Sequence, residues 1–430
     1  MRYHAINNNL FIQNRRNFTK KMKPGAIAIF TSNDLMTKSG DMHYKWHQSP
    51  DLFYLTGIDQ EHTMLVLFPD APMKAWKEML FVRRTDETLK VWEGEKLSRE
   101  KAAQVSGISE VRWADTFEQA LPAMMYQAEH VYLNTNENDR SGDTTESAEF
   151  KLAKKIMQRF PLHQYVRSAP ILTELRMIKS AEEIALIRNA IAITEKGFRR
   201  LLKFVKPGVW EFEVEAELTH EYIRNRGTGH AYEPIVASGA NACILHYIEN
   251  NAPCQAGDLM LLDCAAEYAN YASDLTRTIP VSGKFSSRQK KVYNAVLRVM
   301  QTARSMMKEG MVLADYNTAV GEIMQEELLG LRLITKTDIR KQHPQMPAYK
   351  KYFPHGTAHF LGLDVHDAGN RYAKLKAGAV LTCEPGIYIP EEKMGIRLEN
   401  NILITKGKPV DLMASIPVEA DEIETLMNAK

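Results

Sequence analysis

Short apolar runs separated by polar stretches mark the first part of the chain. Four such runs, with helical stretches between them, lie at 26–30, 64–68, 79–82 and 131–133. Alternating strands and helices of this kind are typical of a small α/β domain. The segment NTNENDRSGDTTES at 134–147 is polar and lacks apolar periodicity, so it predicts a surface loop.

A domain boundary is expected near Ser168-Ala169-Pro170, which gives an N-terminal domain over 1–170 and a second domain over 171–430. In the second domain, Ser180 followed by Glu183 is a capping-box pattern. Apolar residues continue from there with helical spacing to Val205, where Lys206-Pro207-Gly208 ends the helix. A second helix and two paired strands follow, at 211–226, 259–267 and 271–281.

The same order of elements recurs about 100 residues later. Ser287 opens a helix that ends at 308–310, and a second helix runs to Gly330. Strand-like segments follow at 380–389 and 396–405. The recurrence predicts two similar halves around a shared sheet with a site between them, while chance similarity of two helix–strand series is the alternative.

Composition narrows the classes of function. Lys and Arg number 55 against 53 for Asp and Glu, so the formal charge of +2 gives no reason to expect a nucleic-acid partner. No apolar run approaches the roughly 20 residues that span a bilayer, and the N-terminal residues lack an apolar signal segment, so we expect a cytoplasmic protein without a membrane partner. The four cysteines form no CxxC or Cys/His pattern, which argues against disulfides and structural zinc.

Acidic residues interrupt the apolar strands of both halves. They are Asp263 in LLDCAAEY, Asp274 in YASDLTRT, Glu384 in VLTCEPGIYI and Glu399 in IRLENNILIT, and His359 in HGTAHFLGLDVHD adds a nitrogen donor. Strand alternation places Asp274, Thr276 and Thr278 on one face, so Asp274 can converge with Asp263.

Each of these residues alone could be structural, because an isolated strand Asp is usually an edge residue. Four converging carboxylates would repel one another strongly unless cations neutralised them. Four hard oxygen ligands and one imidazole suit a pair of Mn²⁺, Co²⁺, Fe²⁺ or Zn²⁺ ions about 3.5–4 Å apart, without choosing among these metals.

Six ordered motifs carry a family resemblance. ASGANACILHY, LLDCAAEY, SDLTRT, HGTAHFLGLDVHD, CEPGIYI and IRLEN resemble the pita-bread metallopeptidases in order and spacing over residues 170–405. HYKWHQSPDLFYLTG at 43–57 is similar to the N-terminal domain of the aminopeptidase P branch of that family. The resemblance implies an α/β (α+β) fold, in which a smaller N-terminal α/β domain is followed by a catalytic C-terminal pita-bread domain of two pseudo-symmetric halves.

The resemblance also implies roles for the metal ligands. Asp263 would chelate one metal, Asp274 and Glu399 would bridge the two, and the other metal would be held by His359 and Glu384. The implied cofactor is a pair of divalent ions per chain, with Mn²⁺ preferred and Co²⁺, Fe²⁺ or Zn²⁺ as alternatives.

Catalysis and substrate binding involve further residues by the same resemblance. His246 would hydrogen-bond the oxyanion or the substrate carbonyl, and Glu384 would take the proton of the attacking water. The other implied residues are catalytic His366 and the substrate-binding side chains His355, Arg397, Tyr388 and Trp92. Arg397 could instead pair with Glu399 or with an acid of the N-terminal domain.

Two departures from the family pattern occur. Cys264-Ala265 stands where Ala-Gly usually follows the first aspartate, and His47-Gln48 stands where Arg-Gln is usual. The first departure could shift a backbone turn beside the metal, and the second concerns subunit contacts, so neither removes a ligand.

The implied activity is cleavage of an N-terminal residue from a following proline, in peptides with a penultimate proline. A prolidase restricted to Xaa-Pro dipeptides is the alternative enzyme, and a non-catalytic binding protein is the alternative of another class. Trp92 resembles an aromatic residue that family members place at the rim of a neighbouring subunit's site, which predicts a homodimer or homotetramer.

Overall fold

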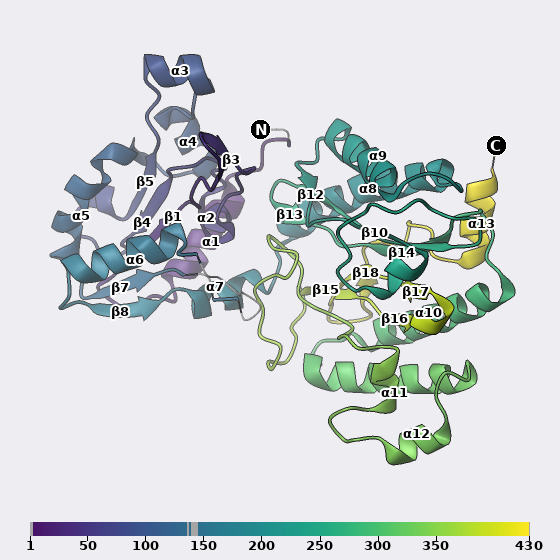
Figure 1. Ribbon diagram of the computed structural model, residues 1–430. Helices are drawn as coiled ribbons and strands as arrows, with labels where there is room; N and C mark the ends of the chain where they lie inside the picture. The colour runs from purple at the N-terminus through teal and green to yellow at the C-terminus, as the bar shows by residue number, and fades with distance from the viewer. Residues whose placement is uncertain (1–2, 136, 139–144, 430) are drawn as a thin grey trace. The chain divides into compact units, whose positions relative to one another are not determined.

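The computed structural model describes residues 3–135, 137–138 and 145–429, and it separates into two compact units (Figure 1). One unit comprises Tyr3–Leu175 and the other Arg176–Lys430. Each unit contains both helices and strands, so the predicted mixed α/β class is confirmed.

A six-stranded sheet forms the centre of the N-terminal unit. Its strand order is β6-β5-β4-β1-β7-β8, with antiparallel pairing of β4 to both β1 and β5 and parallel pairing elsewhere. All four apolar runs predicted as strands belong to this sheet. The strands are β1 (Ala26–Thr31), β4 (Met64–Leu67), β5 (Glu78–Val82), β6 (Glu110–Trp113), β7 (His130–Leu133) and β8 (Gln164–Arg167).

Helices cover both faces of this sheet, because strand alternation gives each face an apolar surface. On one face Ile29 and Phe81 pack with Phe117, and on the other Phe30 meets Phe18 with ring centroids 5.4 Å apart. The helices of this unit are α1 (Asn9–Thr19), α2 (Pro50–Thr56), α3 (Glu87–Glu93), α4 (Arg99–Ser106), α5 (Phe117–Met125), α6 (Ala148–Arg159) and α7 (Ala169–Arg176), of which α3 projects away from the sheet (Figure 1). A small hairpin joins β2 (Thr37–Ser39) to β3 (Met42–His43). Residues 136 and 139–144 of the predicted loop at 134–147 lie outside the described residues, and its other residues belong to neither a helix nor a strand.

Two pairs of helices open the two halves of the C-terminal unit. In the first half, α8 (Ala181–Phe204) starts with the predicted capping box, in which Ser180 and Glu183 exchange hydrogen bonds, and α9 (Glu211–Arg224) packs beside it. In the second half, Ser286 caps α10 (Ser287–Met306) and α11 (Leu313–Gly330) follows. The predicted repeat of helix order is therefore present, with α9 ending two residues earlier than expected. The unit also contains α12 (Lys336–Lys341) and α13 (Ala420–Asn428).

The four long strands predicted for this unit are each broken in two. In the first half, the segments at 259–267 and 271–281 form two antiparallel pairs, β11 with β14 and β12 with β13. The second half repeats this arrangement, with β15 paired to β18 and β16 paired to β17. The strands are β11 (Leu259–Asp263), β12 (Ala266–Tyr268), β13 (Tyr271–Ala272), β14 (Thr276–Pro280), β15 (Val380–Cys383), β16 (Gly386–Ile389), β17 (Met394–Arg397) and β18 (Asn400–Leu403).

Three short strands complete the C-terminal unit. They are β9 (Gly229–His230), β10 (Ile235–Ser238), which extends the sheet beside β11, and β19 (Val410–Asp411) beside β18. Over the parts of the chain that are described, none of the helices combines the length and the apolar character required to cross a membrane.

Candidate active site

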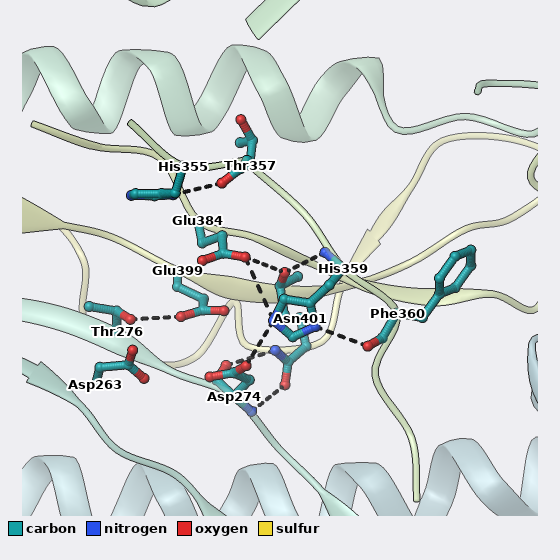
Figure 2. A network of polar contacts seen from close by, with 12 residues as sticks. Asp263, Asp274, Thr276, His355, Thr357, His359, Phe360, Glu384, Glu399 and Asn401 are labelled. Atoms are coloured by element: carbon teal, nitrogen blue, oxygen red, sulfur yellow. Dashed lines mark hydrogen bonds and ion pairs between the residues drawn. The ribbon is translucent and has the colours of Figure 1, made fainter. Parts of the chain in front are cut away.

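The four acidic residues singled out from the sequence lie where the broken strands end (Figure 2). Asp263 is the last residue of β11, and Asp274 lies between β13 and β14. Glu384 lies between β15 and β16, and Glu399 between β17 and β18. Each half thus contributes two carboxylates at equivalent breaks.

Asp274 itself lies outside the ladder, just before β14, which contains Thr276 and Thr278. Asn401 takes over its backbone pairing: the Asp274 N–H donates to Asn401 Oδ1 at 3.1 Å, and Asn401 Nδ2 donates to the Asp274 carbonyl at 2.7 Å. A side-chain amide can satisfy one donor and one acceptor in this way. The break therefore leaves no buried backbone group of Asp274 unpaired and frees its side chain to turn toward the other ligands.

Asp274, His359 and Glu399 form the centre of the site, with one candidate ligand atom from each lying within 4.8 Å of the others. His359 Nε2 is 3.3 Å from Asp274 Oδ2 and 3.6 Å from Glu384 Oε1. Its Nδ1 lies 3.0 Å from the carbonyl oxygen of Phe360, which accepts the Nδ1 proton and leaves the Nε2 lone pair facing the carboxylates. This is the tautomer that binds a metal.

The donor set fits divalent cations. Glu399 is 1% exposed and its Oε2 accepts a hydrogen bond from the Thr276 hydroxyl at 2.6 Å. Its Oε1 is buried without a hydrogen-bond partner among the described residues, and a buried oxygen of this kind is costly unless an ion or water satisfies it. Carboxylate oxygens and one imidazole are suitable ligands for a pair of divalent metal ions.

Protonation in the cluster is strongly perturbed. Burial raises the pKa of Glu384 to about 7, with the charge of Asp274 adding to the rise and His359 opposing it. Burial also raises the pKa of Asp274 and, together with the charges of Asp274 and Glu384, that of Glu399. Burial alone would lower the pKa of His359, but its hydrogen bond with Asp274 and the nearby carboxylate charges raise it. The metal-free cluster therefore holds protons that cations would displace.

Asp263 joins the cluster through a residue that the sequence did not reveal. The Tyr232 hydroxyl lies 2.6 Å from Asp263 Oδ1 and 2.7 Å from Asp274 Oδ1, so it links the two aspartates. The other oxygen of Asp263 accepts from Arg397 Nη2 at 2.6 Å. Arg397 therefore pairs with Asp263, and not with Glu399 as in the alternative considered from the sequence, because the guanidinium reaches across to β11.

Arg397 also belongs to a chain of polar contacts that includes two predicted substrate residues. Its Nη1 donates to the Tyr388 hydroxyl at 2.8 Å, and that hydroxyl is 2.8 Å from His355 Nε2. Burial, with the positive charge of Arg397 adding to it, lowers the pKa of His355 to about 4. His355 is thus neutral at physiological pH, with Nδ1 donating to the Gly356 carbonyl at 2.7 Å and Nε2 accepting from the Tyr388 hydroxyl.

The remaining predicted residues have different surroundings. His366 packs edge-to-face on His359, with ring centroids 4.4 Å apart. His246 is exposed on the loop after β10, next to Tyr247, which shares an apolar cluster with Leu261 and Tyr388. Trp92 lies on α3 of the N-terminal unit and is 82% exposed.

Sequence reasoning missed Tyr232, Asn401 and the hydroxyl of Thr276. Thr276 lies in the motif SDLTRT and Asn401 in the segment IRLENNILIT, each two positions after a proposed ligand. Their proximity in sequence to these ligands was therefore an available signal. Tyr232 is separated by 31 and 42 positions from the aspartates that it contacts. No pattern in the sequence around Tyr232 marks it.

Comparisons with known proteins agree with this geometry. The sequence model of metallopeptidase family M24 matches residues 185–406, and that of the aminopeptidase P N-terminal domain matches residues 11–132. Xaa-Pro aminopeptidases of Escherichia coli and Haemophilus influenzae are each 34% identical to the chain, over 97% of it and 97% of their own lengths. The structure of zinc-substituted E. coli aminopeptidase P in complex with product superposes with a TM-score of 0.88 at 31% identity, covering 99% of both chains.

Proposed function

The chain belongs to metallopeptidase family M24, with an aminopeptidase P N-terminal domain and a pita-bread C-terminal domain, and we propose from this premise that it is a Xaa-Pro aminopeptidase. It hydrolyses the bond between an N-terminal residue and a penultimate proline and requires divalent metal ions. The observation that carries this function is the buried convergence of Asp274, His359, Glu399 and Glu384 from breaks and loops of both halves.

Five residues are our proposed ligands for two ions. Asp263 would hold one ion, Asp274 and Glu399 would bridge, and the other ion would be held by His359 and Glu384. Divalent ions at such a site supply Lewis-acid polarisation of the scissile carbonyl and acidify a water. The hydroxyls of Tyr232 and Thr276 lie 2.6–2.7 Å from oxygens of three of the carboxylates, and such contacts support a site organised before the ions bind.

Glu384 is the proposed general base. Its Oε1 lies 3.6 Å from His359 Nε2, among the proposed metal ligands, where a carboxylate can take a proton from the attacking water. His366 is proposed to donate a proton to the departing proline nitrogen, which its packing against His359 at 4.4 Å supports. His246 is proposed to hydrogen-bond the oxyanion that develops at the carbonyl.

Recognition of proline is assigned to the side of the site that contains His355, Tyr388 and Arg397. The bond before proline is a tertiary amide without an N–H, so the site must recognise the proline ring and the carbonyl group. The 2.8 Å contacts of the Tyr388 hydroxyl with Arg397 Nη1 and His355 Nε2 hold these side chains in fixed positions beside the metal ligands.

The same inner residues would also serve a prolidase, so substrate length decides between the two enzymes. We expect kcat/KM for an Xaa-Pro-Yaa tripeptide to be at least equal to that for the Xaa-Pro dipeptide under the same metal and pH. The match of residues 11–132 to the aminopeptidase P N-terminal domain supports this expectation. A strong preference for the dipeptide would instead identify a prolidase with the same metal site.

Three finer features are part of the proposal. We assign Mn²⁺ as the native metal, a homodimer or homotetramer as the assembly, and the cytoplasm as the location. Exposed Trp92 would reach the rim of a neighbouring subunit's site and contact the peptide. Metal analysis of active protein and the solution mass would test the first two.

A further inference from the structure

Glu211 is a buried carboxylate that the peptidase mechanism does not use. It is the first residue of α9 and is 0% exposed. Ionised carboxylates are almost never fully buried unless strong hydrogen bonds compensate the loss of water. Its position at a helix N-terminus favours the negative charge, and its remaining partners come from a single loop.

That loop, residues 238–252, surrounds the carboxylate with five donors. Glu211 Oε1 accepts from the backbone N–H and the hydroxyl of Ser238, both at 2.7 Å, and from Asn241 Nδ2 at 3.2 Å. Oε2 accepts from the Tyr247 hydroxyl at 2.8 Å and the Ala252 N–H at 2.9 Å. The Glu211 carboxylate therefore forms hydrogen bonds with the start, the middle and the end of the loop.

The outer side of this loop bears His246. Tyr247 turns inward and is 7% exposed, whereas Ile244 and Ile248 on either side are 54% and 51% exposed. His246 is exposed and directly precedes Tyr247. The bond from Tyr247 to Glu211 thus fixes the backbone from which the His246 side chain projects.

The anchored loop is also seated on the strands that hold the metal ligands. A Cβ atom added at Gly395 of β17 would lie 2.0 Å from the carbonyl oxygen of Ala242, so loop and strand backbones are in close contact there. Tyr247 packs in the apolar cluster with Leu261 of β11 and Tyr388 of β16. Moving the loop would therefore change the position of His246 relative to Asp263, the end of β11.

We propose that Glu211 is a positioning residue for peptide hydrolysis: its carboxylate fixes loop 238–252 and thereby places His246 against the reacting carbonyl. The proposal rests on the proposed role of His246. A misplacement of about 1 Å in a group that stabilises the transition state can lower the rate about a hundredfold. Glu211 therefore acts on turnover through His246 and not through the metal ligands.

The test uses Glu211→Gln and Tyr247→Phe in the full-length, metal-loaded protein. In Glu211→Gln, the amide NH₂ replaces one acceptor oxygen and faces the hydrogen-bond donors of the loop, so it cannot pair with them. Tyr247→Phe removes a single hydrogen bond to the carboxylate. Both variants should lower kcat at least about tenfold with KM changed less than about threefold, and metal content should stay at the wild-type level. Glu213→Gln is the matched control, because Glu213 lies on the same helix turn and accepts from the Trp210 N–H in the capping box. Its kcat should stay within about twofold.

A double-mutant cycle separates positioning from general loosening. In a His246→Ala background, Glu211→Gln should lower kcat by less than about twofold further, because the group that it places is gone. If the two effects multiply, or if His246→Ala turns over at the wild-type rate, the proposal is overturned.

Hydrogen exchange provides a readout that does not depend on activity. Peptides from 238–252 should exchange faster in Glu211→Gln and Tyr247→Phe than in wild type, and Glu213→Gln should leave them unchanged. Faster exchange with unchanged kcat would overturn the positioning role. A wild-type protein that lacks Xaa-Pro hydrolysis would refute the proposed function separately, with the anchoring still measurable. If Glu211→Gln does not fold, Tyr247→Phe decides the outcome alone.

Discussion

Replacing Glu384 by Gln should stabilise the metal-free protein at high pH and at the same time remove most of its catalytic activity. Glu384 lies in the break between β15 and β16, with its Oε1 3.6 Å from His359 Nε2 and 3.2 Å from the Thr382 hydroxyl. Burial, assisted by the charge of Asp274 and opposed by His359, raises its pKa from 4.5 to about 7. An amide of similar shape keeps the packing but cannot ionise.

The sign of the effect follows from proton linkage. A carboxyl with a higher pKa in the folded than in the unfolded state keeps its proton longer when folded, so the wild type loses stability as the pH rises from about 4.5 to about 7. The difference of about 2.5 between the two pKa values corresponds to a loss of about 3 kcal/mol at pH 8 and of about 1 kcal/mol or less at pH 5. The Gln variant does not lose this stability, because its side chain cannot ionise.

Urea unfolding in the presence of a chelator at pH 5 and pH 8 measures the effect. We expect Glu384→Gln to be more stable than wild type at pH 8 by up to about 3 kcal/mol, with the two much closer at pH 5. Saturating divalent metal should reverse the order, because the wild type binds the ions more tightly and gains more stability from them. Turnover of the variant should fall about 10²–10⁴-fold, the contribution of a general base.

Glu391→Gln is the control for this experiment. Glu391 undergoes the same chemical change but its side chain is 59% exposed, 3.5 Å from Lys351 Nζ. Relative to wild type, the Glu391→Gln protein should show no comparable gain in stability between pH 5 and pH 8. A chelated Glu384→Gln protein less stable than wild type at pH 8 would refute the reasoning that burial of an ionised Glu384 opposes folding without metal.

Three other predictions concern the metal centre and the N-terminal unit. Active protein should contain about two divalent ions per chain and lose activity with chelator; active protein without metal would be inconsistent with the site. Tyr232→Phe, which removes the hydroxyl between Asp263 and Asp274, should weaken metal affinity about 10–100-fold in a chelator competition while the far-UV spectrum stays unchanged, and unaltered affinity would argue against that link. Trp92→Ala should raise KM more than it lowers the melting temperature, and the wild type should sediment as a dimer or larger; a fully active monomer would contradict the proposed role of Trp92.

Local signals in the sequence predicted much of the fold. The capping box at Ser180 and the spacing up to Val205 predicted α8 to within one residue at its C-terminal end, because caps and apolar periodicity depend on neighbouring residues. The acidic residues were identifiable because a carboxylate in an apolar strand is energetically anomalous. The strand breaks at these residues could not be predicted in detail, since the pairing lost by Asp274 is replaced by Asn401, 127 positions away.

The partner of Arg397 shows why the remaining site geometry needed the structure. Two positions of spacing suggested that Arg397 and Glu399 share a face, but β17 ends at Arg397 and Glu399 lies in the break beyond it. Thr276 separates them, because its hydroxyl donates to Glu399 Oε2 at 2.6 Å and accepts from Arg397 Nε at 3.2 Å. The guanidinium is thereby directed to Asp263.

This arrangement also explains why the cluster requires cations. Arg397 balances one carboxylate, Asp263, at 2.6 Å. Of the other three carboxylates, His359 contacts two, at 3.3 Å from Asp274 and 3.6 Å from Glu384. When these three carboxylates are ionised, their charge exceeds what one imidazole can neutralise, so the protein must either hold protons, as the raised pKa values indicate, or bind metal ions. A direct Arg397–Glu399 pair would have neutralised a bridging ligand, and its absence leaves Glu399 Oε1 available to a metal ion.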